Sequence, residues 1–72
     1  MSSRKFKKEI LEQLHDILAQ RGLVQLGETR YFIVGGQIKM RRGDCRRTWL
    51  VSNFSYEKIE GVLNCIKTKF QI

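Results

Sequence analysis

A cluster of cationic side chains flanks the Gly43-Asp44 pair near the middle of the chain. Its members are Lys39, Arg41, Arg42, Arg46 and Arg47. Arginine contacts phosphates and can donate two parallel hydrogen bonds to a guanine edge, and a two-stranded β-ribbon fits the major groove of DNA. The cluster therefore predicts anion binding, with nucleic acid as the first candidate partner. The alternative is a solvated hairpin tip whose charges discourage strand pairing.

The charge of the whole chain favours the same interpretation. Its 72 residues include 14 Lys and Arg against 7 Asp and Glu, a net charge of +7 at pH 7. Such an excess points to nucleic acid first, an acidic protein second and a membrane surface third. We expect residues 1–8 to form a basic arm that leads into a helix, with Lys5 and Lys8 contacting a flanking phosphate backbone. Tyr31 is expected beside the cluster as a single stacking ring, which favours duplex DNA as the partner, with RNA as the other nucleic acid to consider.

The run YFIVGGQIKMRRGDCRRTWLVS, residues 31–52, reads as a hairpin with a two-residue turn at Gly43-Asp44. Such a turn sets Met40 opposite Arg47 and, because neighbouring residues alternate, separates two faces. The apolar face then contains Phe32, Val34, Ile38, Met40, Trp49 and Val51, and the opposite face contains Gln37, Lys39, Arg41, Arg46 and Thr48. We expect helices to cover the apolar face and to bury Trp49.

The Gly35-Gly36 pair offers a competing turn, since two glycines between apolar runs are a hairpin signal. The apolar pattern at even positions nevertheless continues through the pair without a change of phase. The sequence therefore favours one long strand in which the glycines mark a bend or a bulge.

Two amphipathic helices are predicted on either side of the strands. Apolar residues recur at helical spacing in both segments: Phe6, Ile10, Leu11, Leu14, Ile17 and Leu18 in the first, and Tyr56, Ile59, Val62, Leu63, Ile66 and Phe70 in the second. Gly22 is expected to end the first helix and Ser55 to cap the second. A short strand at 23–26, joined to Tyr31 by a turn at Gly27-Glu28, completes the strands. The prediction is a single α+β domain over residues 1–72, ordered α-β-β-β-α, in which a three-stranded antiparallel meander has both helices on one face.

This order resembles the double-stranded-RNA-binding domain and the HicA-type toxin ribonucleases. The resemblance is one of topology. The second helix begins Ser55-Tyr56-Glu57-Lys58, without the basic Lys-Lys-x-Ala-Lys of the RNA-binding domain, and the strand histidine of the toxins is missing, with Arg30 or Tyr31 in its place. The run RRTWLVSNFSYEKIEGVL is similar to the last strand and helix of plant ethylene-response-type and phage integrase arm-type domains. That resemblance implies DNA recognition by a sheet.

A second function class follows from apolar residues expected on the open face of the sheet. Val24, Ile33 and Leu50, with Tyr31, would form an exposed apolar end beside the basic tip. Exposed apolar patches often mark protein interfaces. The runner-up is therefore a protein-interaction or inhibitor module, which forms a homodimer or docks on an acidic protein.

Catalysis has little support in this sequence. His15 is the single histidine, and together with Cys45 and Cys65 it does not supply the closely spaced ligands of a zinc site. We therefore expect no enzyme activity, no catalytic residues, no metal and no cofactor. The chain also has no apolar run long enough to span a membrane and no signal-peptide pattern, so a cytoplasmic location is expected.

Overall fold

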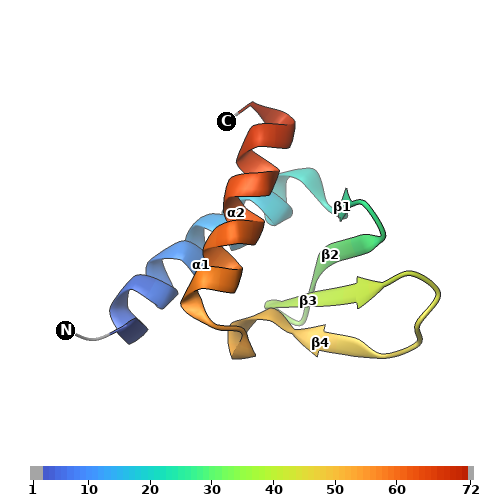
Figure 1. Cartoon of the computed structure of the whole chain (residues 1–72), viewed down its shortest axis with the longest axis horizontal. Helices are drawn as coiled ribbons and strands as arrows, with labels where there is room; N and C mark the ends of the chain where they lie inside the picture. The colour runs from blue at the N-terminus through green and yellow to red at the C-terminus, as the bar shows by residue number, and fades with distance from the viewer. Residues whose placement is uncertain (1–2, 72) are drawn as a thin grey trace.

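The computed structural model describes the backbone of residues 3–71 and the side chains of residues 7–71. Its elements are α1 (Ser3–Arg21), β1 (Val24–Leu26), β2 (Thr29–Val34), β3 (Gln37–Arg42), β4 (Thr48–Leu50), a 3-10 turn η1 (Val51–Asn53) and α2 (Tyr56–Phe70). The strands form one antiparallel sheet in the order β1-β2-β3-β4 (Figure 1). The predicted α+β class is confirmed, although the sheet contains four strands where three were expected.

The additional strand arises at Gly35-Gly36, where the prediction of one long strand is wrong. Both glycines have positive φ, 59° and 77°, and Val34 pairs with Gln37 across them. A two-residue turn of this kind needs positive φ at both central positions, which glycine adopts without steric cost. The glycine pair therefore divides residues 29–42 into β2 and β3.

This turn changes which β2 side chains share a face with β3. Because opposed residues share a face, the pairs Tyr31↔Met40 and Ile33↔Ile38 put the odd residues of β2 with the even residues of β3. Phe32 consequently lies on the other face, opposite Lys39. The expected placement of Phe32 and Val34 on the helix-covered face is wrong, since an uninterrupted strand would have kept the phase that the turn reverses.

Both helices pack on the same face of the sheet, as predicted (Figure 1). The buried core combines residues from α1, α2 and this face: Ile10, Leu14, Leu18, Val24, Tyr31, Ile38, Val51, Ile59, Leu63 and Ile66. Within each helix these core residues recur three or four residues apart, the spacing of one helical face. The periodicity read from the sequence therefore identifies the buried faces of both helices.

The helix ends follow the predicted local chemistry where the structure describes them. Gly22, at φ 77°, donates its N–H to Leu18 O and closes α1 after Arg21. The Ser55 side chain accepts a hydrogen bond from Lys58 N and caps α2. The expected arm is helical from Ser3 onward, so that Lys7 and Lys8 lie on α1, while the side chain of Lys5 lies outside the described residues.

The C-terminal half of α2 holds α1 and the edge of the sheet together. Lys67 Nζ donates to Gln13 Oε1 on α1 at 3.1 Å, and Lys69 Nζ donates to the backbone oxygen of Gln25 on β1. The second bond satisfies a backbone acceptor of an edge strand, a position otherwise open to pairing with another chain.

Trp49 is less buried than the sequence predicts. It lies on the helix-covered face, opposite Met40, but remains partly exposed, and it is not among the partly buried residues packed on the core. The main helix–strand packing places α1 on β2 and α2 on β1, at a distance from the edge strand β4. No helix within residues 3–71 has the length and hydropathy needed to cross a bilayer.

Candidate nucleic-acid interface

A five-residue loop, residues 43–47, joins β3 to β4 and projects beyond the two helices (Figure 1). The predicted two-residue turn at Gly43-Asp44 is wrong, because Met40 pairs with Trp49 rather than with Arg47. Gly43 donates its N–H to Glu28 O in the β1–β2 turn, so β3 continues beside β2 after its pairing with β4 has ended. The pairing of β4 with β3 is shifted by two residues from the predicted register. An even shift keeps the β4 side chains on their predicted faces, and Arg46 and Arg47 become loop residues.

Arg41 supports this loop from inside the sheet. Its Nε donates a hydrogen bond of 2.7 Å to the backbone oxygen of Cys45, and the N–H of Cys45 donates to Arg42 O at 3.1 Å. Two hydrogen bonds thus hold the middle of the loop to the end of β3. They restrict the positions that Arg46 and Arg47 can reach.

Arg47 lies against the Trp49 ring, with its guanidinium carbon 5.5 Å from the ring centroid. A cation over an aromatic face at this distance is attracted by the ring quadrupole. The N–H groups of the guanidinium remain available for hydrogen bonds in this arrangement, because a ring face attracts the charge and does not occupy the donors. The Trp49 ring therefore lies beside the loop, and its fluorescence is sensitive to changes around Arg47.

The open face of the sheet divides into a basic half and an apolar half. Across the strands, Arg30 pairs with Arg41 and Arg41 with Thr48. One row closer to the Gly35-Gly36 turn, Phe32 pairs with Lys39 and Lys39 with Leu50. Since opposed residues share a face, this surface carries three cations, one aromatic ring and an apolar border.

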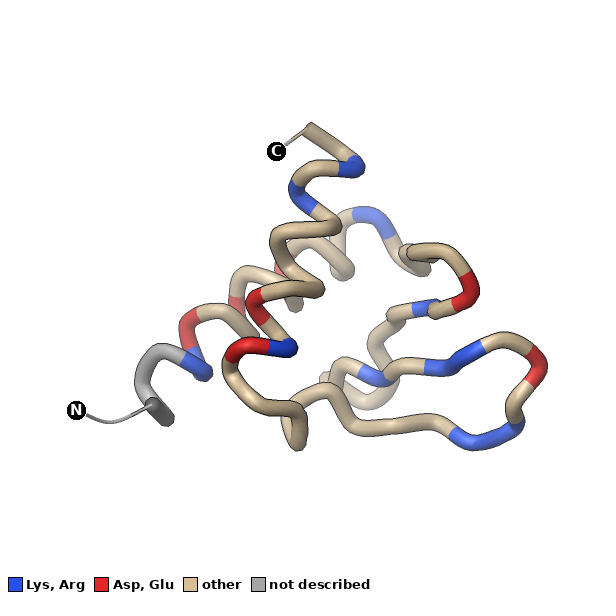
Figure 2. Tube along the Cα trace, in the orientation of Figure 1, with Lys and Arg blue, Asp and Glu red and all other residues tan. Residues whose placement is uncertain are grey.

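The acidic residues lie mainly on the helices, whereas Lys and Arg occur on both the helices and the sheet (Figure 2). Residues 24–50 contain six Lys and Arg against two acidic residues, Glu28 and Asp44, both in turns. The other five acidic residues belong to the helices. No strand of the sheet carries a carboxylate, and the acidic residues that flank the strands, Glu28 and Asp44, lie in turns.

The sequence predictions for this surface meet different outcomes. Lys39 and Arg41 lie on the open face, Arg42 is exposed at the end of β3, and Arg46 and Arg47 are exposed in the loop. Lys8 is exposed on α1, and the structure gives no described side chain for Lys5. The cations gather at the loop end of the sheet, apart from the lysines of α1, but they are divided between its faces: Arg42, opposite Thr29, has the register of the helix-covered face.

The prediction that Tyr31 lies on the open face is wrong, because its side chain lies in the core. Its side chain is 6% exposed, and it shares the helix-covered face with Met40. Burial raises the pKa of the Tyr31 phenol above its ordinary value of 10.0, with a smaller contribution from the nearby Cys65. Tyr31 cannot stack on a base in this fold.

The proposed apolar interface also needs correction. Val24 is 1% exposed in the core, and Ile33 is partly buried against it. Leu50 does lie on the open face, opposite Lys39, and its apolar neighbours there are Phe32 and Val34. The Gly35-Gly36 turn exchanges the two sets of β2 residues between the faces.

Sequence reasoning missed Arg30, Phe32 and Val34 as surface residues. A two-residue turn at the glycine pair would have placed all three on the face of Lys39 and Arg41. Within the described residues, no three His, Cys, Asp or Glu side chains are placed to bind a metal ion, and Cys45 and Cys65 are exposed free thiols.

Comparison of the chain with protein-family models, with curated proteins and with solved structures finds no match. The resemblance to three-stranded RNA-binding and toxin domains therefore stays at the level of element order, from which the four-stranded sheet departs. The case for a function rests on the basic loop and the open face of the sheet.

Proposed function

We propose that this protein is a non-enzymatic nucleic-acid-binding domain, which contacts duplex DNA through the β3–β4 loop and the basic half of the open face. The observation that carries the proposal is the grouping of Arg30, Lys39 and Arg41 on one surface beside the exposed arginines of the loop. A polyanion neutralises such a cluster and releases the counterions bound along its own backbone, which favours association.

The loop arginines keep their donors available for a ligand. Within the described part of the chain, neither Arg42 nor Arg46 forms an ion pair with a carboxylate. An arginine that is not engaged by a protein carboxylate can contact a phosphate without first breaking an internal bond. Because Arg41 holds the loop through Cys45 O, part of the ordering cost of binding is met before the ligand arrives.

Duplex DNA suits the shape of this surface. The β3–β4 ribbon and its loop project beyond the helices, and the major groove of DNA, about 12 Å wide, admits a two-stranded ribbon. Phe32 is the aromatic residue on the open face and is partly buried, so stacking on unpaired bases has a single ring to use. Electrostatic and groove contacts therefore favour a duplex over a single strand.

The direct test is a titration of labelled duplex DNA, duplex RNA and single strands at two salt concentrations. We expect duplex DNA to bind most tightly and its affinity to fall steeply with salt, with a log-log slope of about 0.9 for each phosphate neutralised. The fluorescence of Trp49, the single tryptophan, should change on binding because its ring lies against Arg47. Absence of binding below about 0.1 mM at physiological salt, where non-specific binders usually register, contradicts the proposal.

The apolar half of the open face supports a second candidate, self-association. Val34 is 50% exposed, and Phe32 and Leu50 border the same surface. A face-to-face dimer would bury these three side chains, and such desolvation is insensitive to salt. Light scattering should then give a dimer mass that Val34→Glu reduces to that of a monomer. A monomer mass for the wild type at both low and high salt rules out this candidate.

A further inference from the structure

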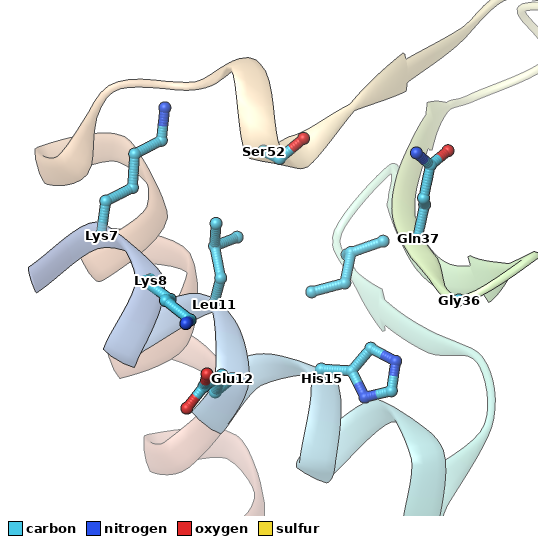
Figure 3. Close-up of a pocket in the computed structure, with 9 residues that line it drawn as sticks. Lys7, Lys8, Leu11, Glu12, His15, Gly36, Gln37 and Ser52 are labelled. Carbon is cyan, nitrogen blue, oxygen red and sulfur yellow. The ribbon is translucent and has the colours of Figure 1, made fainter. Parts of the chain in front are cut away.

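A cleft of about 450 Å³ lies between the first half of α1 and the start of β3 (Figure 3). Leu11 and Ile38 give it apolar walls, and the β2–β3 turn borders it at Gly36. Its volume falls within the range of about 300–1,000 Å³ that is typical of small-molecule sites. The cleft is therefore large enough for a ligand, and its chemistry differs from that of the basic loop.

The spacing of residues on α1 directs several side chains toward this cleft. Lys8, Leu11, Glu12 and His15 lie three or four residues apart, which places them on one side of the helix. Figure 3 shows Lys7, Lys8 and Glu12 along one flank, His15 and Gln37 on the other flank, and Ser52 of η1 above. The Lys7 and Lys8 side chains extend in different directions along the first flank, which also carries the Glu12 carboxylate.

The polar side chains around the cleft are not engaged with one another. No hydrogen bond or ion pair to another described residue is made by the side chains of Lys7, Lys8, Glu12, His15, Gln37 or Ser52. The amide of Gln37, the hydroxyl of Ser52 and the imidazole of His15 supply both donors and acceptors. They match a planar ring with hydrogen-bonding edges, while the long, rotatable side chains of Lys7 and Lys8 supply positive charge for a phosphate.

We propose that this cleft binds a nucleotide, with its phosphate on Lys7 and Lys8 and its base between Leu11 and Ile38. The Glu12 carboxylate, beside the lysines, accepts hydrogen bonds from ribose hydroxyls. The cleft is separate from the basic loop, because β3 runs from Gln37 at the cleft to Arg42 at the loop, about 17 Å at the rise of an extended strand. A free mononucleotide can therefore bind here whether or not the loop binds nucleic acid, whereas a strand terminus as ligand rests on the proposed function.

Two sources can supply this nucleotide: a free mononucleotide, or the terminal nucleotide of a strand that lies on the open face. Both present a 5′-phosphate, a sugar and a base, but a DNA terminus has no 2′-hydroxyl and its 3′-oxygen is esterified, so the contact of Glu12 with sugar hydroxyls belongs to the free ribonucleotide. Gln37 links the two surfaces, since it is part of the cleft and its strand position belongs to the open face. The source is decided by experiment.

The first measurement is an amide NMR titration of the full chain with adenosine 5′-monophosphate, with adenosine and inorganic phosphate as matched ligands. We expect saturable shifts at His15, Gln37 and Ser52 with the mononucleotide, and weaker binding of each fragment because each lacks half of the contacts. Shifts at the loop alone, or equal binding of phosphate and the mononucleotide, overturn the proposal.

Two charge-matched variants separate the cleft from the loop. Lys7→Ala with Lys8→Ala should weaken mononucleotide binding about tenfold or more, the loss expected for charge-assisted hydrogen bonds. The variant should fold, because it removes cations from the positive end of the α1 dipole. Arg46→Ala with Arg47→Ala should leave mononucleotide affinity unchanged while it weakens binding of duplex DNA. Equal mononucleotide affinity in the lysine variant and the wild type overturns the cleft proposal, whatever the duplex result.

The last measurement compares strands with and without a 5′-phosphate, each in competition with adenosine 5′-monophosphate. Tighter binding of the phosphorylated strand, with displacement of the mononucleotide, identifies a strand terminus as the ligand. Simultaneous binding of strand and mononucleotide identifies a free nucleotide. A strand that displaces the mononucleotide equally well with or without its phosphate contradicts the assignment of Lys7 and Lys8 to the phosphate.

Discussion

Replacement of Arg42, Arg46 and Arg47 by alanine is expected to lower the affinity for duplex DNA about 100-fold at physiological ionic strength. Each arginine that contacts a phosphate adds about 0.9 to the slope of log affinity against log salt, so the triple variant should flatten that slope by nearly three units. All three side chains are exposed at the end of β3 or in the loop. Fluorescence anisotropy of a labelled duplex over a range of salt concentrations measures both effects.

A charge-matched control distinguishes the loop from the net charge of the chain. Lys58→Gln, Lys67→Gln and Lys69→Gln remove the same number of charges from α2, on the helical side of the molecule, and keep a hydrogen-bond donor where Lys67 and Lys69 bond to Gln13 and Gln25. If the loop is the interface, this variant should retain most of the affinity and slope, provided that circular dichroism shows it to be folded. Equal losses in the two variants would mean that net charge alone drives binding and that the loop has no special role.

Tyr31→Ala is expected to destabilise the fold by about 3–5 kcal/mol, the usual cost of removing a large buried aromatic side chain. Tyr31 is 6% exposed and contributes to the core under the helices. Total stability is commonly about 5–15 kcal/mol, and a chain of 72 residues belongs at the low end, so the variant should be largely unfolded or nearly so. Urea denaturation followed by circular dichroism measures the change.

The neighbouring aromatic residue provides the matched control. Phe32→Ala removes a ring from the open face, opposite Lys39, and should cost well under half as much stability. The same variant should weaken binding of single strands more than that of duplex DNA, because a ring can stack only on unpaired bases. Greater destabilisation by Phe32→Ala than by Tyr31→Ala would show that the two faces of β2 are exchanged.

The burial of Tyr31 also predicts how stability depends on pH. Its folded-state pKa lies above the unfolded value near 10.0, so the folded state binds the phenolic proton more tightly. The resulting stabilisation is complete below the unfolded pKa and is lost as the pH rises through the folded pKa. The free energy of unfolding should therefore fall less steeply with rising pH above 10 in Tyr31→Phe than in the wild type. The hydrogen bond to Glu60 also raises the pKa of the Tyr56 phenol, so Tyr31→Phe is best compared with the wild type in a Tyr56→Phe background, which removes that second contribution.

The helices and their buried faces could be predicted from the sequence because their causes are local. A three-and-four spacing of apolar residues identifies the buried side of a helix wherever the helix packs, and Leu14, Leu18, Ile59 and Ile66 are all in the core. Gly22 and the Ser55 cap end and begin helices through bonds to residues within four positions. The arginine cluster was likewise visible, since charges near a turn stay exposed whatever its length.

The faces of β2 and the length of the β3–β4 loop were decided by tertiary structure. A strand has a period of two, so one turn at Gly35-Gly36 is enough to move Tyr31 into the core and Phe32 out of it. The local pattern was compatible with one strand or two. Burial of Val24, Tyr31 and Ile38 under the helices is consistent with only the second arrangement. In the five-residue loop, Gly43 bonds to Glu28 in a turn far away in the sequence, a contact that no local sequence window contains.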